Sequence, residues 1–303
     1  MTGTPTPAAT LLVDASIWVF RAWFSLPATM TDPAGRQVNA LYGFARFLVE
    51  LLERERPAHL ACAFDESLTT SFRNDLYSAY KANREEAPEA LVEQFQRCRA
   101  LCRALGVPEL AHPRFEADDL IGSLMQRHRA RRAPFVIVTR DKDLAQLLEP
   151  GDALLDWSGG QRTAFDEVAA RFGVPPAQFA DYLGLVGDSV DNIPGVPRVG
   201  PATARALLAR FGSLDALYED LASVAGVKVR GAGTLAARLA EHREQAFLSR
   251  ALATIARDAP VSDDADALRR GDVDAAALRH LCDEAGFGEG LGVRAARLAR
   301  DAS

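Results

Sequence analysis

Three apolar stretches of this chain each run directly into aspartate. They are LLVD (11–14), HLACAFD (59–65) and FVIVTRDKD (135–143), and they end at Asp14, at Asp65 and at the pair Asp141 and Asp143. Short apolar runs of this kind predict buried strands. The helical spacing of Leu and Phe in residues 40–55 predicts a helix between the first two strands, and strands that alternate with helices predict a parallel sheet. Ligands of open α/β sheets bind beyond the carboxyl ends of the strands. A single strand-end Asp often only begins a turn, but together these acids are expected to meet at one edge.

The rest of the chain agrees with an α/β fold in which a mostly parallel central sheet is flanked by helices. A fourth strand is predicted at 152–157, and helical patterns dominate from residue 165 onward. The 303 residues are 48% hydrophobic and 25% charged, which is typical of one large or two smaller globular domains. No apolar run approaches the ~20 residues of a membrane span. The first ten residues lack the features of a signal peptide.

The four cysteines indicate free thiols of a cytoplasmic protein. Cys98 and Cys102 are four residues apart, and Cys62 and Cys282 stand alone. No CxxC pair or neighbouring His pair accompanies them, which argues against a structural zinc site.

A second group of acids opens a predicted helix in RFEADDLIGSL (114–124). Glu116, Asp118 and Asp119 fall within four positions. One or two acids at this place are explained by helix capping and by the helix dipole. Three neighbouring acids also suggest a bound cation, and the stretch alone leaves both interpretations open.

The segment LVGDSVDNIPGVPRVGPATARALLARFGSL (185–214) predicts a tight hairpin between two helices. Asp188 and Asp191 share one face if they lie on a helical turn. Gly195 and Gly200 permit a sharp turn, and Pro201 suits the first position of a helix. Backbone N–H groups at such a helix start can bind a phosphate, and would read DNA backbone without reading sequence. The same hairpin can also be purely structural.

Taken together, these motifs resemble the 5′-nuclease superfamily. They are most similar to the bacterial 5′→3′ exonuclease/flap endonuclease family, which also forms the N-terminal domain of DNA polymerase I. The matching stretches are LLVDASIWVFRAW, ALYGF, AFD, SFRNDLYSAYKANR, FEADDLIGSL, VTRDKDLAQLL and the segment from Asp181 to Leu214. The chain departs from the family at Phe20, where Tyr is frequent, at Arg140, where Gly is frequent, and at EEAP (85–88) after YKANR.

The resemblance implies a domain organisation. A disordered tail (1–10) precedes a PIN-like or Rossmann-like nuclease core (11–180), in which residues 72–105 form a helical arch. A helical region (181–303) follows and contains a helix-hairpin-helix motif at about 185–220. It also implies a stand-alone nuclease, since no polymerase domain follows.

The resemblance further implies a structure-specific 5′ nuclease that hydrolyses phosphodiester bonds in DNA with two Mg²⁺ ions. Mn²⁺ can substitute, and K⁺ is expected at the helix-hairpin-helix. The first metal is surrounded by Asp14, Asp65, Glu116, Asp118 and Asp119, and the second by Asp141, Asp143, Asp188 and Asp191. Lys81 and Arg84 neutralise the phosphate in the transition state, and Tyr80 stacks on a base. DNA contacts are expected from Arg21, Arg73, Lys142, Gly195, Arg198, Gly200 and Thr203.

The net charge of −6 argues at first against a nucleic-acid partner. Removing the nine metal-site acids changes −6 to +3, so the remaining surface is slightly basic. The expected partners are 5′-flap, nicked or gapped DNA, RNA primer ends and a DNA polymerase. The protein is expected to act as a monomer in the cytoplasm, in replication or repair, and not to bind a membrane. The alternatives are a phosphatase on a similar sheet, a catalytically weak DNA-binding module and a structural calcium-binding protein.

Overall fold

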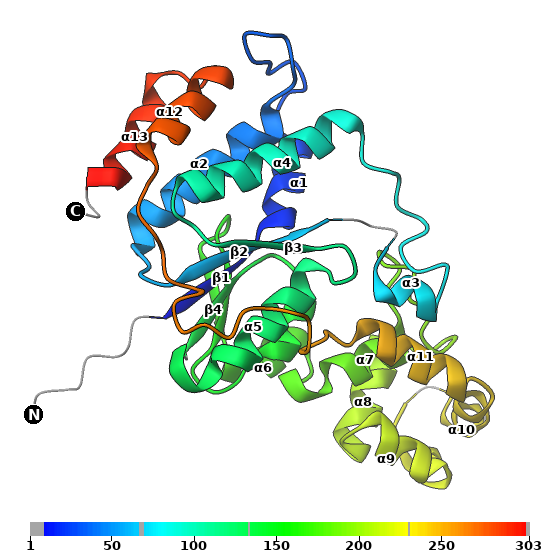
Figure 1. Ribbon diagram of the computed structural model, residues 1–303. Coiled ribbons are helices and arrows are strands. Elements are labelled where there is room, and N and C mark those ends of the chain that lie inside the picture. Colours follow the sequence, from blue (N-terminus) through cyan, green and yellow to red (C-terminus); the bar gives the residue numbers. More distant parts are fainter. Residues whose placement is uncertain (1–8, 67–69, 133, 230, 301–303) are drawn as a thin grey trace, which may run out of the picture.

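A six-stranded sheet forms the centre of the molecule (Figure 1). The computed structural model describes residues 9–66, 70–132, 134–229 and 231–300. The strands are β1 (Thr10–Asp14), β2 (Leu60–Asp65), β3 (Glu109–His112), β4 (Phe135–Val138), β5 (Ala153–Asp156) and β6 (Gln161–Ala164). Their order is β3-β2-β1-β4-β5-β6, and every neighbouring pair is parallel except β5 and β6. The predicted fold class and the four predicted strands are confirmed.

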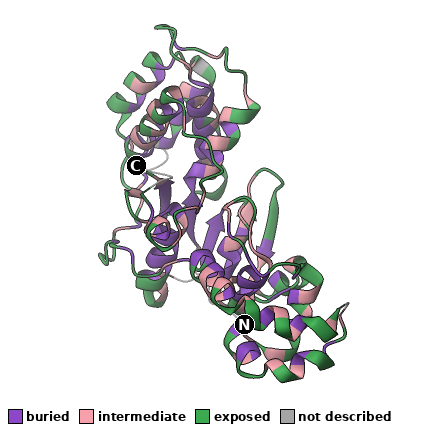
Figure 2. Ribbon diagram, turned by 90° about the vertical axis from the view of Figure 1, so that its right-hand side faces the viewer, coloured by how far each residue is buried: buried purple, intermediate pink, exposed green. Residues whose placement is uncertain are grey.

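Both faces of the sheet are covered because the strand side chains alternate between two apolar clusters. In β1, Leu11 and Val13 pack with α1 (Ala15–Ser25), α2 (Asn39–Glu55) and α4 (Glu89–Ala104), whereas Leu12 packs with α5 (Ala117–Arg132). All three of these β1 side chains are buried, and Figure 2 shows the strands buried between helices whose outer faces are exposed. This placement leaves the carboxyl ends of the strands as the open edge of the sheet.

The two strands absent from the sequence expectation are short and carry few apolar residues. β3 (ELAH) has four half-buried residues, and β6 (QRTA) is exposed at its first two positions. Since both lie at the ends of the sheet, only one side of each is paired, and an apolar run is not required of them.

The expected helical arch at 72–105 is smaller in the structure. Only α3 (Phe72–Leu76) and the turns that follow it lie over the sheet edge, while α4 packs against α2 through Leu91, Cys98 and Leu101, all buried. The apolar face of α4 makes it part of the nuclease core. The segment that can act as an arch is therefore 72–88.

The elements within the expected helical region at 181–303 are all helices, and they pack in two separate places. Its first part contains α7 (Phe179–Val186), α8 (Pro201–Phe211), α9 (Leu214–Glu219), α10 (Ala232–Glu241) and α11 (Arg243–Ala253). The last two helices, α12 (Ala275–Glu284) and α13 (Glu289–Arg300), instead pack on α4 and α2, where Leu278 and Cys282 join the core beside the sheet. Figure 1 shows this pair at the far side of the molecule from α8 and α9.

The remaining elements are short. They are α6 (Val168–Phe172) and the 3₁₀ turns Asp143–Leu147, Phe165–Glu167, Pro176–Gln178 and Leu221–Gly226. Within the described ranges, the structure contains no helix with both the length and the apolar character to cross a membrane. The predicted tail at 1–10 lies, up to residue 8, outside the described residues.

Candidate active site at the carboxyl edge of the sheet

The strand-end acids meet at one edge, as the topology predicts. Asp14 ends β1, and its Oδ2 accepts a hydrogen bond of 2.8 Å from Oγ1 of Thr139, which follows β4. Asp65 ends β2 and accepts a bond of 2.9 Å from the backbone N–H of Ala117, the first residue of α5. This last bond ties the N-terminus of α5, with its acids, to the same edge. The convergence of the two acidic groups is therefore a property of the fold.

Burial and then mutual repulsion raise the pKa of several carboxyls at this edge. Burial, followed by repulsion from Asp65, raises the pKa of Asp14 to about 7. Burial and then Asp141 raise the pKa of Asp143 to about 7, and burial and then Asp141 raise that of Asp118 well above its ordinary value. Like charges held this close destabilise each other unless a cation or a proton neutralises them. The donor set therefore fits hard divalent cations, which prefer carboxylate oxygens.

Glu116 lies just before α5 and has one oxygen available. Its Oε2 accepts bonds from Lys81 Nζ at 2.8 Å and from the Tyr80 hydroxyl at 3.1 Å. Its Oε1 is buried and has no hydrogen-bond donor among the residues that the structure describes. A buried carboxylate oxygen without a partner is costly, and a bound cation or water would satisfy it.

Lys81 and Arg84 reach the acids from the arch segment. Burial alone would lower the pKa of Lys81, but Glu116 and then Asp191 raise it overall, so the ammonium stays charged. The Lys81 side chain is 8% exposed, and Arg84 pairs with Asp191. A cavity of about 600 Å³ lies beside them, lined also by Asp65, and has room for a substrate segment next to the acids.

Asp188 and Asp191 lie in a loop after α7, so they do not share a helix face. α7 ends at Val186, and Asp188 forms an antiparallel bridge with Ile193. The Asp188 carboxylate accepts a bond of 2.7 Å from the N–H of Val190, which holds the loop. Lys142 Nζ lies 3.2 Å from Asp143 Oδ1 and 3.6 Å from Asp188 Oδ2, so it bridges the two parts of the second acidic group.

In this arrangement the acids do not form a closed cage. Across the described ranges, no three His, Cys, Asp or Glu side chains are close enough together to hold one metal ion directly. Lys81 and Arg84 instead supply positive charge to Glu116 and Asp191.

Arg73 and Asp119 form a buried pair that the sequence did not reveal. The guanidinium donates to both Asp119 oxygens, at 2.7 and 2.8 Å, and to the carbonyls of Leu252 and Thr254, at 2.7 and 2.9 Å. Asp119 also accepts from the N–H groups of Glu116 and Ala256. The prediction that Arg73 contacts DNA is wrong, because its side chain is 3% exposed and four of its five N–H groups are hydrogen-bonded within the protein. Asp119 likewise has no oxygen left for a metal.

The base-stacking role expected of Tyr80 is also contradicted. Tyr80 is 3% exposed, and its ring lies under Lys81 Nζ at 5.1 Å. Burial and then Glu116 raise the pKa of the hydroxyl, so it remains a hydrogen-bond donor to that carboxylate. Tyr80 therefore positions Glu116 and has no free face for a base.

The hairpin has the expected tight turn, but only one of the two glycines is needed for it. Gly195 has φ +61°, and a Cβ there would lie 2.3 Å from the backbone nitrogen of Gly187. Gly200 is the N-cap of α8 with φ −90° and ψ 176°, and a Cβ there meets nothing within 4 Å. Arg198, at φ 62°, is exposed, and Thr203 is half-buried in the first turn of α8. The N-terminus of α8 therefore faces an open surface.

Two positioning residues were missed by the sequence reasoning. Thr139 donates to Asp14 and accepts from the N–H of Asp141, and Ser16 Oγ accepts from the N–H of Asp65. Both lie two residues from a strand-end acid, in motifs already noted, so small hydroxyl residues beside such acids were the available signal. Arg21, expected at the DNA, lies on α1 in a groove described below.

Comparison with known proteins agrees with this geometry. Residues 9–173 match the family model of the 5′-3′ exonuclease N-terminal resolvase-like domain, and residues 174–276 match that of the 5′-3′ exonuclease C-terminal SAM fold. DNA polymerase I of Pseudomonas aeruginosa is 41% identical over 281 residues, covering 92% of this chain and 31% of that protein. DNA polymerase I of Bacillus caldotenax is 36% identical over 281 residues, covering 91% and 31%. The chain thus spans about a third of the length of these curated relatives.

Solved structures share the fold at low sequence identity. The T5 D15 protein co-crystallised with metal ions has a TM-score of 0.67 at 16% identity, covering 97% of this chain and all of that one. The catalytic core of Rad2 in complex with DNA substrate has a TM-score of 0.65 at 16% identity, covering 97% and 93%.

Proposed function

The chain belongs to the 5′→3′ exonuclease family and is a 5′ nuclease, and we propose that it cleaves DNA at 5′ single-stranded flaps and from 5′ ends with two Mg²⁺ ions. The observation that carries this proposal is the meeting of strand-end acids with Lys81 and Arg84 at one edge. Carboxylates and cations facing one space suit a reaction in which a charged phosphate must be both bound and neutralised.

The acids divide into two groups by their place at the edge. Asp14, Asp65, Asp118 and the unpartnered oxygen of Glu116 would hold one ion, and Asp141, Asp143, Asp188 and Asp191 the other. Because no three acids are close enough for direct chelation as they stand, several would act through water, which Mg²⁺ retains readily. Two divalent cations held there would supply an activated water, charge stabilisation for the leaving oxygen and neutralisation of the scissile phosphate. Mn²⁺ should substitute for Mg²⁺.

Lys81 and Arg84 would bind the scissile phosphate. Without substrate they are paired with Glu116 and Asp191. Neutralising the charge of those two carboxylates would free the Lys81 and Arg84 side chains from them. Both side chains could then turn toward a phosphate in the adjacent cavity. Tyr80 keeps Glu116 oriented during this exchange, and the pair of Arg73 and Asp119 holds the start of α5.

The hairpin and α8 would bind the duplex beside the cleavage site. Gly200 leaves the N-terminus of α8 without a side chain, so backbone N–H groups, Arg198 and Thr203 can approach phosphates. A K⁺ ion at the hairpin carbonyls would strengthen the phosphate contact of the hairpin. Lys142 would contact the strand next to the acids. Since phosphates carry no base information, binding should be independent of sequence.

The names of the relatives and of the structural neighbours bear on the biological setting. The polymerase relatives and the DNA complex of Rad2 support action on DNA in replication or repair, in the cytoplasm and beside a polymerase. The proposed substrates are flaps, nicks, gaps and RNA primer ends. The protein is proposed to act on them as a monomer.

Cleavage of a 5′-labelled flap duplex, with and without Mg²⁺, tests the proposal. We expect metal-dependent release of the flap by the wild-type chain and none by Asp118→Asn. A phosphatase would instead release only terminal phosphate, and a non-catalytic module would bind the duplex without cutting it. Either of these two results would contradict the proposal.

A further inference from the structure

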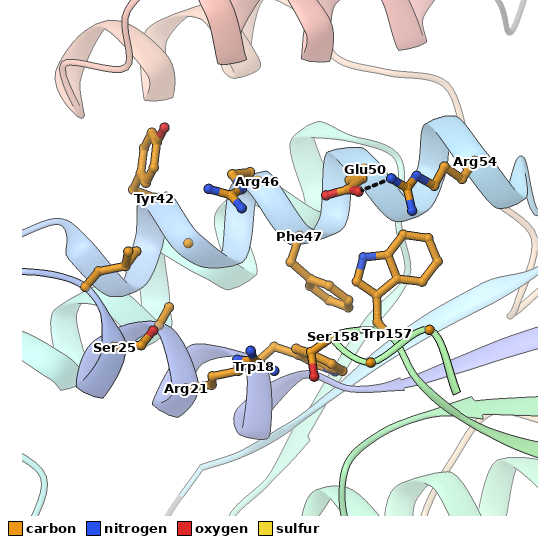
Figure 3. Close-up of a pocket in the computed structure, with 15 residues that line it drawn as sticks. Trp18, Arg21, Ser25, Tyr42, Arg46, Phe47, Glu50, Arg54, Trp157 and Ser158 are labelled. Atoms are coloured by element: carbon orange, nitrogen blue, oxygen red, sulfur yellow. Dashed lines mark ion pairs between the residues drawn. The ribbon is translucent and has the colours of Figure 1, made fainter. Parts of the chain in front are cut away.

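A groove of about 580 Å³ lies between α1, α2 and the turn from β5 to β6 (Figure 3). Its lining contains none of the nine acids of the sheet edge. α1 follows directly from Asp14, and Arg21 in the groove wall is seven residues further on. At 1.5 Å per residue, Arg21 therefore lies ~10 Å along the helix from the acidic edge.

The groove is positively charged. Arg21 comes from α1, and Arg46 and Arg54 come from α2; Figure 3 shows Arg21 and Arg46 on opposite walls. The single acid of the lining is Glu50, and it pairs with Arg54 at 2.7 Å. Arg21 and Arg46 are exposed, and across the described ranges neither has a carboxylate within 4.0 Å. Two unpaired guanidinium groups facing one space favour an anion between them.

One end of the groove is a fixed aromatic surface. Trp18 stacks on Phe47 with ring centroids 4.5 Å apart, and Phe47 meets Trp157 edge to face at 6.4 Å. Trp157 is half-buried, and the Arg54 guanidinium lies over its ring at 5.5 Å. Ser158, Gly159 and Gly160 follow it, so the turn beside the ring has no bulky side chains. An indole held in this way loses little freedom when a flat ligand packs on it.

We propose that this groove binds a single-stranded segment of nucleic acid, with phosphates on Arg21 and Arg46 and a base against Trp157. A basic channel combined with an aromatic surface is the physical basis of sequence-independent single-strand binding. A base can reach the indole only when it is unpaired. The volume suits roughly one or two nucleotides, by comparison with pockets that hold small ligands. The proposal rests on the proposed function, because the segment is a part of the nuclease's DNA substrate that extends from the acidic edge over α1.

Binding of a short fluorescent oligo(dT), measured by anisotropy in EDTA, tests the groove without cleavage. Arg46→Glu removes one phosphate contact and adds repulsion, so we expect affinity to fall about tenfold. Trp157→Leu should weaken binding about fivefold or more, since a stacked base contributes about 1–3 kcal/mol. The matched control is Arg127→Glu, an exposed position on α5 at the other face of the sheet, which should change affinity less than about twofold.

The outcomes separate this proposal from the nuclease assignment. If Arg46→Glu and Trp157→Leu bind oligo(dT) as the Arg127→Glu control does, the groove is not a strand site, even if the chain cleaves flaps. If the wild-type chain cleaves no flap DNA, the nuclease assignment fails, while oligo(dT) binding in EDTA still decides the groove. Should Trp157→Leu fail to fold, the exposed Arg46→Glu decides the question alone.

Discussion

Replacing Arg73 with Ala should destabilise the protein more than any exposed arginine change. The Arg73 side chain is 3% exposed and that of Asp119 is fully buried, and two short hydrogen bonds join them. Truncation leaves the Asp119 carboxylate in the core with only two backbone N–H donors. It also leaves the carbonyls of Leu252 and Thr254 without these donors.

The expected loss follows from that uncompensated charge. Breaking a buried ion pair by removing one partner costs about 3–5 kcal/mol. For a chain of this size, each kcal/mol lowers the melting temperature by about 2 °C, so a decrease of roughly 6–10 °C is expected. The matched control is Arg114→Ala, which removes a pair with Asp75 whose side chains are 49% and 65% exposed. Its cost should stay below about 1 kcal/mol.

Urea denaturation of both variants measures the difference directly. A double-mutant cycle with Asp119→Ala should show that the two changes are not additive, with a coupling of about 0.5–3 kcal/mol. Arg73→Ala and Arg114→Ala of equal stability would refute the reasoning, because they would show that the Arg73 pair is not desolvated. The result also matters for catalysis, since this pair joins the first turn of α5 to the segment that leaves α11.

Four further predictions concern the acids, the arch and the hairpin. Without metal, stability should fall as pH rises from about 4 to about 7, because Asp14 and Asp143, whose pKa is raised to about 7, keep protons that the unfolded chain has released. Thermal melts at several pH values measure this dependence, and Asp14→Asn should make the decrease of stability with pH less steep. An unchanged decrease in that variant would contradict the prediction. Asp118→Asn should raise the metal-free melting temperature at pH 7 and remove nearly all flap cleavage; full turnover at saturating Mg²⁺ would oppose the two-metal assignment. Lys81→Ala should lower the single-turnover cleavage rate far more than it lowers flap affinity, and an effect on affinity alone would argue against the transition-state role. Hydrogen exchange should show residues 72–87 more protected with flap DNA than without it. Gly200→Val should weaken duplex binding and keep the fold, because a Cβ there meets nothing within 4 Å and a poorer N-cap residue costs only about 1 kcal/mol. Gly195→Val should instead impair folding, because its Cβ would collide with the backbone of Gly187. Unaltered duplex affinity in Gly200→Val would rule out phosphate contact at the N-terminus of α8.

Much of the site could be predicted from the sequence because its chemistry follows a local pattern. An apolar run that ends in Asp specifies both a buried strand and the place of its carboxylate, and parallel pairing brings such ends together. This reasoning located Asp14, Asp65 and the acids after β4 at one edge. The hairpin is local in the same sense, since Gly195 and Pro201 specify a turn and a helix start within a few residues.

Other roles depended on contacts between residues far apart in the chain, and these only the tertiary structure decided. Arg73 lies in a charged, polar segment, yet it is buried because Asp119, 46 residues away, and Leu252, 179 residues away, accept its hydrogen bonds. Tyr80 is buried for the same kind of reason, through Glu116. The groove needs Arg46 from α2 and Trp157 from the turn after β5. Sequence periodicity shows which face of an element is apolar, but whether a charged side chain meets solvent, a phosphate or a buried partner depends on which distant element packs against it.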